Sequence, residues 1–240
     1  MPQCNMGKAV PLAILTGSIF MRLCASHVSL ERSGRIIVSG LSFEVCGGEL
    51  LTITGANGAG KSTLLRALAG LLPPSAGKIS CGGLNDDRTL AMQTHYLGHL
   101  DALKTALTAQ ENLEFWADMG EGGMSPLRAL GKVALAHVAE FPVGYLSAGQ
   151  KRRVALARLL VAHRPVWLLD EPTTALDAQS QAMFADLVRA HLANGGLVVA
   201  ATHAPLGIEG ARELRLNPVA SARRAEKPAP PDFETNRSLP

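Results

Sequence analysis

The segment Gly55-Ala-Asn-Gly-Ala-Gly-Lys-Ser-Thr63 constrains this chain more than any other feature. It follows the short apolar run Leu50–Thr54 and leads into a helix-like run from Ser62 to Leu72. Glycines let the backbone bend so that several N–H groups converge, and the start of a helix adds partial positive charge. Strand, loop and helix in this order fit the pattern GxxxxGK[ST]. The segment therefore predicts a site for a polyphosphate.

Each residue type in this loop has a physical role. The ammonium of Lys61 can reach the β- and γ-phosphates of a nucleotide, and the Ser62 hydroxyl can ligate Mg²⁺. Thr63 can bond a phosphate oxygen. We expect ATP to contact the whole loop, which comprises Gly55, Ala56, Asn57, Gly58, Ala59, Gly60, Lys61, Ser62 and Thr63.

A second segment, Val166-Trp-Leu-Leu-Asp-Glu171, is an apolar strand that ends in two acids. A buried strand places Asp170 at its carboxyl end, where it can hold Mg²⁺ and its hydration shell. Glu171 can then act as general base on the attacking water. Beside a phosphate loop, this pair predicts hydrolysis.

A third segment, Leu146-Ser-Ala-Gly-Gln150, opens a helix with a serine cap. Its backbone N–H groups would form another anion site. One chain has no evident need for two γ-phosphate sites, but two copies arranged head to tail would use each site across their interface.

The order of Gly55–Thr63, Leu146–Gln150, Asp170–Glu171 and His203 resembles the ABC ATPase family over about residues 21–216. The resemblance implies a homodimer with two ATP molecules between phosphate loops and opposing signature segments. Ser147, Gly149 and Gln150 would then contact the partner's ATP, and His203 would contact the γ-phosphate. Lys61, Glu171 and His203 are the catalytic residues that it implies.

The sequence leaves the family pattern in places. The signature has Ala148 where glycine is commoner. The family's glutamine after the strand ending near Gly98 is replaced by His99 or Leu100, and the spacing fits both. Arg32 occupies the usual place of the aromatic residue that stacks on adenine.

The elements alternate, and so predict an α/β fold of the P-loop NTPase, ABC ATPase type, with a mainly parallel sheet. Two N-terminal strands joined by a turn would be antiparallel, and three consecutive helices would form a subdomain at about 105–162. The expected strands are 23–30, 36–45, 50–54, 94–98, 166–169, 197–201 and 212–216. The expected helices are 62–72, 109–119, 126–139, 147–162 and 178–193.

Composition limits the kinds of partner and metal ion that we expect this chain to bind. The net charge is only +3, and residues 21–216 are close to neutral, so we expect no nucleic-acid partner. The four cysteines form no CxxC pair, which argues against zinc and favours reduced thiols. His95 and His99 are four positions apart, but the two flank a strand, so metal ligation is not expected.

The two ends are expected to lie outside the folded domain. Residues 1–20 include the apolar stretch 9–20, too short to span a bilayer, which we interpret as a non-native or disordered extension from an upstream start codon rather than an export signal. Residues 217–240 are rich in proline, alanine and charge and predict a disordered tail. The domain itself is expected at 21–216.

The segment from Tyr96 to Leu113, with its Gly-His pair, Lys-Thr, Leu-Thr and Glu-Asn-Leu, resembles the haem exporter ATP-binding subunits of bacterial cytochrome c maturation. That resemblance implies a peripheral subunit on the cytoplasmic face of the inner membrane, with integral membrane transporter subunits and, indirectly, a haem-handling chaperone as partners. The alternatives are an ABC subunit for another small molecule or lipid, and a soluble ABC ATPase outside transport.

Overall fold

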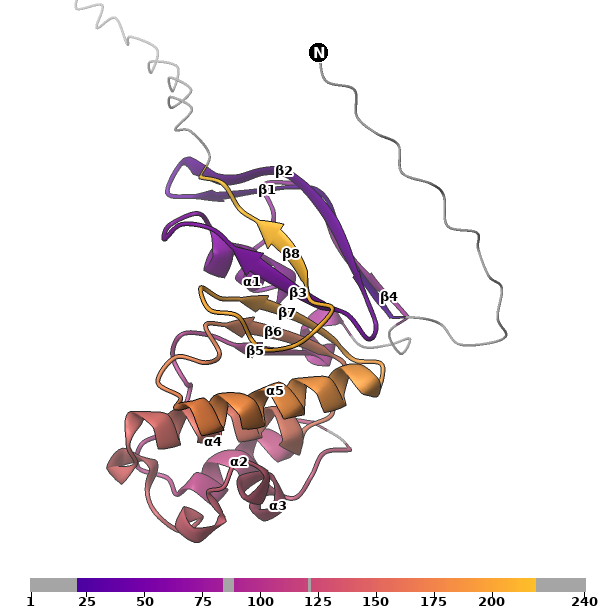
Figure 1. The fold of residues 1–240 in the computed structure, drawn as a ribbon. Helices are drawn as coiled ribbons and strands as arrows, with labels where there is room; N and C mark the ends of the chain where they lie inside the picture. Colours follow the sequence, from indigo (N-terminus) through magenta and orange to yellow (C-terminus); the bar gives the residue numbers. More distant parts are fainter. Residues whose placement is uncertain (1–20, 84–88, 121, 219–240) are drawn as a thin grey trace, which may run out of the picture.

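The strands form two sheets in the computed structural model, which describes residues 21–83, 89–120 and 122–218 (Figure 1). One is antiparallel, in the order β2-β1-β4; the other is parallel, in the order β5-β6-β7-β3-β8. The predicted fold class is confirmed. The strands are β1 Arg22–Arg32, β2 Arg35–Cys46, β3 Leu50–Thr54, β4 Ala76–Gly82, β5 Thr94–Leu97, β6 Val166–Asp170, β7 Leu197–Ala201 and β8 Arg212–Arg215.

The five α-helices in the described residues are α1 Lys61–Leu68, α2 Ala109–Ala117, α3 Pro126–Lys132, α4 Ala148–Val161 and α5 Ala178–Ala193. Short 3₁₀ turns lie at Leu90–Gln93, Ala136–Val138 and Val143–Tyr145. None of the helices in the described part of the chain is long and apolar enough to cross a bilayer. The predicted N-terminal extension, residues 1–20, lies outside the described residues, as does the predicted tail from residue 219 onward.

Two residues form the turn of the β1–β2 hairpin. Ser33 and Gly34 have φ angles of 52° and 74°, and Arg32 pairs with Arg35 across the turn. Two successive residues with positive φ match the twist of antiparallel strands, as in a type I′ turn. The predicted turn is confirmed.

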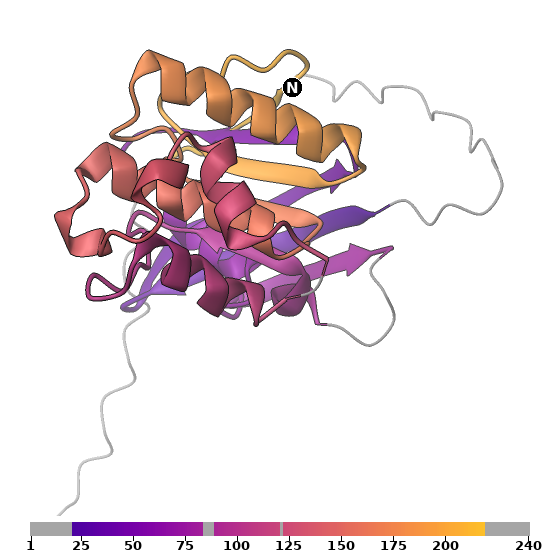
Figure 2. The same ribbon diagram turned by 90° about the horizontal axis from the view of Figure 1, so that it is seen from below.

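The parallel sheet is buried on both faces, and successive residues of β6 point into different cores. Val166 and Leu168 pack with α1 and the antiparallel sheet, whereas Trp167 and Leu169 pack with α2–α5. This alternation explains why β6 reads as an unbroken apolar run. Figures 1 and 2 show α1 between the two sheets and α2–α5 gathered on the opposite side of the parallel sheet.

Three expectations about elements need correction. The helix predicted to reach Leu72 ends at Leu68, because Gly70 (φ 73°) forms a Schellman turn, with Gly70 N–H donating to Ala67 and Leu71 N–H to Arg66. The helix predicted for 126–139 ends at Lys132, in the same kind of turn, with the non-glycine residue Ala134 at φ 56°. Strand β4 was not predicted, since most of its residues are exposed and its apolar alternation is limited to Ile79 and Cys81.

The outer edge of β5 is covered by arginines rather than by another strand. The carbonyls of Thr94, Tyr96 and Gly98 accept hydrogen bonds from Arg164 (2.9 Å), Arg158 (2.8 Å) and Arg152 (3.2 Å), respectively. Arg158 is only 3% exposed and also lies over the Trp116 ring at 4.4 Å. Since an unpaired buried carbonyl is costly, these arginines attach α4 and the residues after it to the edge of the sheet.

Candidate functional site

A cavity of about 530 Å³ opens at the carboxyl end of the parallel sheet, between the phosphate loop, the end of β6 and the segment after β7. It contains most of the residues that the sequence predicted. Its lining consists of Arg32, Ile37, Asn57, Gly58, Gly60, Lys61, Ser62, Thr63, His99, Asp170, Glu171, Thr174 and His203.

Backbone geometry in the phosphate loop requires glycine at two positions. Gly55 has φ 140°, and a Cβ atom there would collide with the carbonyl oxygen of Leu216. Gly60 has φ 100°, immediately before α1, and a Cβ would come within 2.7 Å of Ile37 Cγ2. Both conformations disfavour a side chain, so the loop can pass close to β2 and the end of β8 only with glycine.

The Lys61 side chain is only partly accessible and lies under the loop. Its ammonium donates to the carbonyls of Gly55 (2.8 Å) and Ala56 (3.3 Å) and lies 3.1 Å from Nε2 of His203. Ala59, by contrast, is 2% exposed and packs in the core below the loop. Gly55, Ala56 and Ala59 therefore shape the loop without lining the cavity.

The acidic pair lies opposite Lys61. Asp170 is the last residue of β6 and is 4% exposed. Glu171 has a φ of 47°, and its N–H donates to Ala201 at 2.8 Å. Its Oε1 is buried, has no hydrogen-bond partner among the described residues, and lies 3.6 Å from His203 Nε2. A carboxylate oxygen that lies beside a histidine and accepts no hydrogen bond from the described residues is available to accept a proton from water.

The structure distinguishes the two residues that the sequence left open. His99 lines the cavity with the acids, whereas Leu100 is 82% exposed and is not part of its lining. Arg32 also reaches the cavity, beside Ile37. The placement of His99 depends on where β5 ends. The strand ends at Leu97, a boundary that the sequence alone did not define to within one residue.

The signature segment lies outside this cavity. Ser147 caps α4: its hydroxyl accepts from the N–H of Gln150 (3.2 Å), and the Gln150 side chain accepts from the N–H of Ser147 (2.8 Å). Gly149 packs closely under the Ala175 carbonyl, which a Cβ would approach to 3.0 Å. Within one copy, the structure therefore does not bring Ser147, Gly149 and Gln150 to the phosphate loop.

Two further histidines, His95 and His191, have structural surroundings outside this cavity. His95 Nε2 lies 2.9 Å from the Ala162 carbonyl, and burial lowers its pKa to about 3. His191 stacks on Trp167 at 3.9 Å, and burial lowers its pKa to about 4. The described residues contain no cluster of three or more metal-ligating side chains. Cys24, Cys46 and Cys81 are free thiols.

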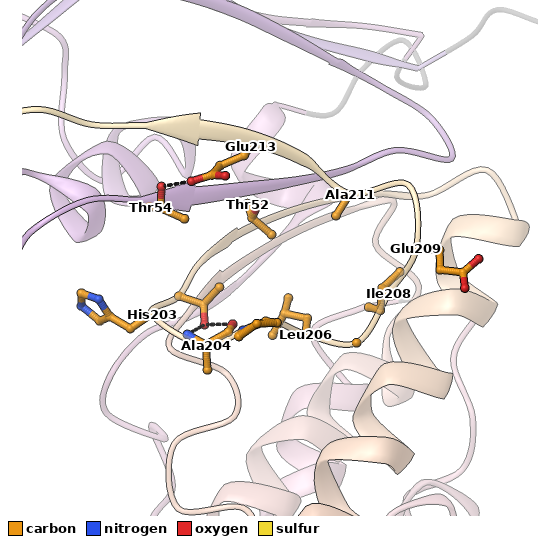
Figure 3. Close-up of a pocket in the computed structure, with 12 residues that line it drawn as sticks. Thr52, Thr54, His203, Ala204, Leu206, Ile208, Glu209, Ala211 and Glu213 are labelled. Carbon is orange, nitrogen blue, oxygen red and sulfur yellow. Dashed lines mark hydrogen bonds between the residues drawn. The ribbon is translucent and has the colours of Figure 1, made fainter.

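A second cavity, of about 580 Å³, borders the first at His203. Figure 3 shows it between β3, β8 and the segment after β7, with the hydrogen bond from Thr54 to Glu213 (2.5 Å) on one side. The His203 ring points away from Leu206 and Ile208. The lining of this second cavity is mostly apolar, and its carboxylates, Glu209 and Glu213, would repel negative charge. The second cavity therefore does not suit a polyphosphate.

Comparison with known proteins places this arrangement in a family. The family model described as "ABC transporter" matches residues 38–174. Curated relatives called cytochrome c biogenesis ATP-binding export protein CcmA include those of Chelativorans sp. (54% identical, covering 82% of this chain and 98% of the relative) and Rhodopseudomonas palustris HaA2 (55%, 83% and 100%). This chain belongs to the CcmA family of ABC transporter ATP-binding proteins. As a member of that family it is an ABC-type ATPase.

Solved structures agree with the fold of this family. An ATP-bound bacterial Atm1-family ABC exporter has a TM-score of 0.70 at 27% identity, with 85% of this chain matching 38% of that one. A dimeric post-hydrolysis state of the ATP-binding cassette MJ0796, bound to ADP and Pi, has a TM-score of 0.65 at 27% identity over 76% of this chain and 88% of that one. A putative ABC transporter ATP-binding protein from Pyrococcus furiosus has a TM-score of 0.69 at 21% identity, covering 81% and 97%.

Proposed function

We propose that this chain is the ATP-hydrolysing subunit of an exporter in cytochrome c biogenesis, and that its ATP cycle drives haem export or the release of a haem-loaded chaperone. The observation that carries the proposal is similarity, at 50–55% identity over 82–83% of this chain and 95–100% of the relatives, to proteins named for that process. The cavity supports it with Lys61, Asp170 and Glu171 in one place.

Hydrolysis follows from the charges in the cavity. The Lys61 ammonium and the N–H groups at the start of α1 stabilise negative charge on the β- and γ-phosphates. Glu171 accepts the proton of the water that attacks the γ-phosphorus, through the carboxylate oxygen that has no hydrogen-bond partner among the described residues. His203, within 3.1 Å of Lys61 and 3.6 Å of Glu171, lies where it can contact the γ-phosphate.

A divalent cation fits the same cavity. Ser62 and Asp170 line it with a hydroxyl and a carboxylate, which are oxygen donors of the kind that Mg²⁺ prefers. When bound, Mg²⁺ would neutralise charge on the phosphate oxygens. His99 can donate a hydrogen bond from the side of the cavity where related ATPases have glutamine.

The assembly we infer is a head-to-tail homodimer held against integral membrane subunits on the cytoplasmic face of a bacterial inner membrane. In it, Ser147, Gly149 and Gln150 of one copy complete the ATP site of the other. The separation of the signature segment from the cavity within one copy supports this arrangement, as does the dimeric form of the solved cassette with ADP and Pi.

Two measurements test the proposal. Lys61→Ala should lower ATP turnover by at least about 100-fold because it removes the main cation on the γ-phosphate, whereas the exposed lysine variant Lys78→Ala should not. Normal turnover by the Lys61 variant would contradict the site. Deletion of the gene should abolish c-type cytochromes, and complementation by Glu171→Gln should fail; a full set of c-type cytochromes in the deletion strain would contradict the pathway.

A further inference from the structure

Arg152 is a buried arginine in the first turns of α4, close behind the signature segment. Its side chain is about 5% exposed, and its guanidinium contacts two segments that lie far apart in the sequence. One of these is the loop Gly98–Asp101, which carries His99; the other is the end of β6 and the residues after it, which carry the acidic pair.

The bonds to the loop fix its position relative to α4. Nη1 of Arg152 donates to the Gly98 carbonyl at 3.2 Å and to the Asp101 carboxylate at 2.8 Å. These two acceptors lie on either side of His99, whose side chain lines the ATP cavity. The loop is therefore held at both ends by one planar group.

The bonds to the acidic pair run along consecutive carbonyls. Nη2 donates to Asp170 (3.1 Å) and Glu171 (2.7 Å), and Nε donates to Pro172 (3.1 Å). These contacts use the backbone and leave both carboxylates free to act in the cavity. A guanidinium can satisfy so many acceptors because its five N–H groups lie in one rigid plane.

Glu171 needs such support. Its φ of 47° lies in the left-handed region, which costs roughly 1–2 kcal/mol for a residue with a side chain. Its N–H is held by Ala201 and its carbonyl by Arg152. Loss of the second bond would let the peptide relax, and the carboxylate would move with it.

We propose that Arg152 is a positioning residue for ATP hydrolysis, which holds Glu171 and His99 in register with each other and with the first turn of α4. This inference rests on the proposed role of Glu171 as general base. It assigns to the helix behind the signature segment a second task, performed within its own copy, besides the contact expected across the dimer.

The test separates kcat from nucleotide affinity in the full-length chain. Arg152→Gln should lower kcat about 30- to 100-fold, since a misplacement of about 1 Å can cost two orders of magnitude. The dissociation constant for ATP should change by less than about threefold, because Arg152 makes no bond to the phosphate loop. Arg152→Lys should not rescue kcat, since one ammonium cannot reach all five acceptors. Its neighbour Arg153, which donates to the Val133 carbonyl and to none of the acceptors of Arg152, provides the matched control: Arg153→Gln should keep kcat within about twofold.

A double-mutant comparison separates positioning from general destabilisation. In a Glu171→Gln background, Arg152→Gln should lower the residual turnover by less than about twofold, because no base is left to position. A full additional loss would indicate a merely structural role and overturn the proposal. If Glu171→Gln itself turns over ATP at the normal rate, it is the base assignment that fails.

Asp101→Asn keeps the experiment decisive if Arg152→Gln does not fold. Among the described residues, Asp101 is the only carboxylate bonded to Arg152, and its side chain is 27% exposed, so its amide variant should fold. We expect a roughly 3- to 10-fold lower kcat with unchanged ATP affinity. Normal kcat in this variant, with Arg152→Gln either normal or unfolded, would overturn the proposal.

Discussion

Replacement of Ser147 by aspartate should separate the two tasks of the signature segment. Within one copy, Ser147 caps α4 through the bond to Gln150 N–H, and Asp177 caps α5 through the equivalent bond to Ser180 N–H at 2.7 Å. Aspartate is therefore a competent cap in this protein. In the proposed dimer, the same position would face the γ-phosphate of the partner's ATP.

The expected stabilities follow from the cap. Ser147→Ala loses the side-chain acceptor, which costs about 1 kcal/mol, or a Tm about 2–4 °C lower for a chain of this size. Ser147→Asp keeps the acceptor and places a negative charge at the start of a helix, so its Tm should equal or slightly exceed that of the wild type.

For dimerisation, we expect Ser147→Asp to be more damaging than Ser147→Ala, the reverse of their effects on stability. A carboxylate about 4 Å from a phosphate oxygen costs roughly 4 kcal/mol at an effective dielectric constant of 20, and a closed dimer would contain two such contacts. In a Glu171→Gln background with ATP, Ser147→Ala should weaken dimerisation, and Ser147→Asp should abolish it at micromolar concentrations. Binding of ATP to the monomer should not change, since Ser147 does not line the cavity of its own copy.

Analytical ultracentrifugation with ATP, together with thermal unfolding and binding of a fluorescent ATP analogue, measures all three quantities on the same samples. The wild type and Ser147→Asp should both be more stable than Ser147→Ala. Dimerisation should be strongest in the wild type, weaker in Ser147→Ala and weakest in Ser147→Asp. An aspartate variant that dimerises like the wild type would refute the inferred assembly, whatever its stability.

Further predictions concern pH, the phosphate loop and the loop before α2. His95 and His191 have pKa values lowered by burial, so their contribution to stability is complete above the unfolded pKa of 6.5 and is lost as pH falls towards about 4. For each histidine, the free energy of unfolding should fall by about 2 kcal/mol between pH 7 and pH 5. In urea titrations, the free energy of unfolding of His95→Gln should depend less on pH than that of the wild type. Gly60→Ala should weaken ATP-analogue binding at least tenfold, because its Cβ would meet Ile37; wild-type affinity would contradict the geometry. Asn112→Ala removes four hydrogen bonds to residues 104–108 and should lower the free energy of unfolding by about 2 kcal/mol in urea titration.

The sequence predicted best what depends on neighbouring residues. The phosphate loop and the β1–β2 turn each require particular residue types within a few positions, and the structure has both. Strands β6 and β7 were also clear, because burial on both faces produces a continuous apolar run.

What the sequence could not give depends on contacts between distant residues. Strand β4 exists because it pairs with β1, and nothing in its own side chains requires it. His99 and Leu100 could be told apart only when the end of β5 was fixed against β6. The five acceptors of Arg152 lie in two segments that are distant from it in the sequence, so sequence motifs alone do not reveal its role.

The arginines along β5 also bear on how this protein avoids self-association through its sheet. An uncovered edge strand offers its carbonyls to any passing extended chain, and such edges start aggregation. At β5, Arg164, Arg158 and Arg152 already occupy the three outward carbonyls. At the other edge, β8 has the charged sequence Arg-Glu-Leu-Arg. Arginines bonded to one edge strand and charged side chains on the other therefore disfavour pairing of this sheet with another strand, even where copies of the protein are crowded together.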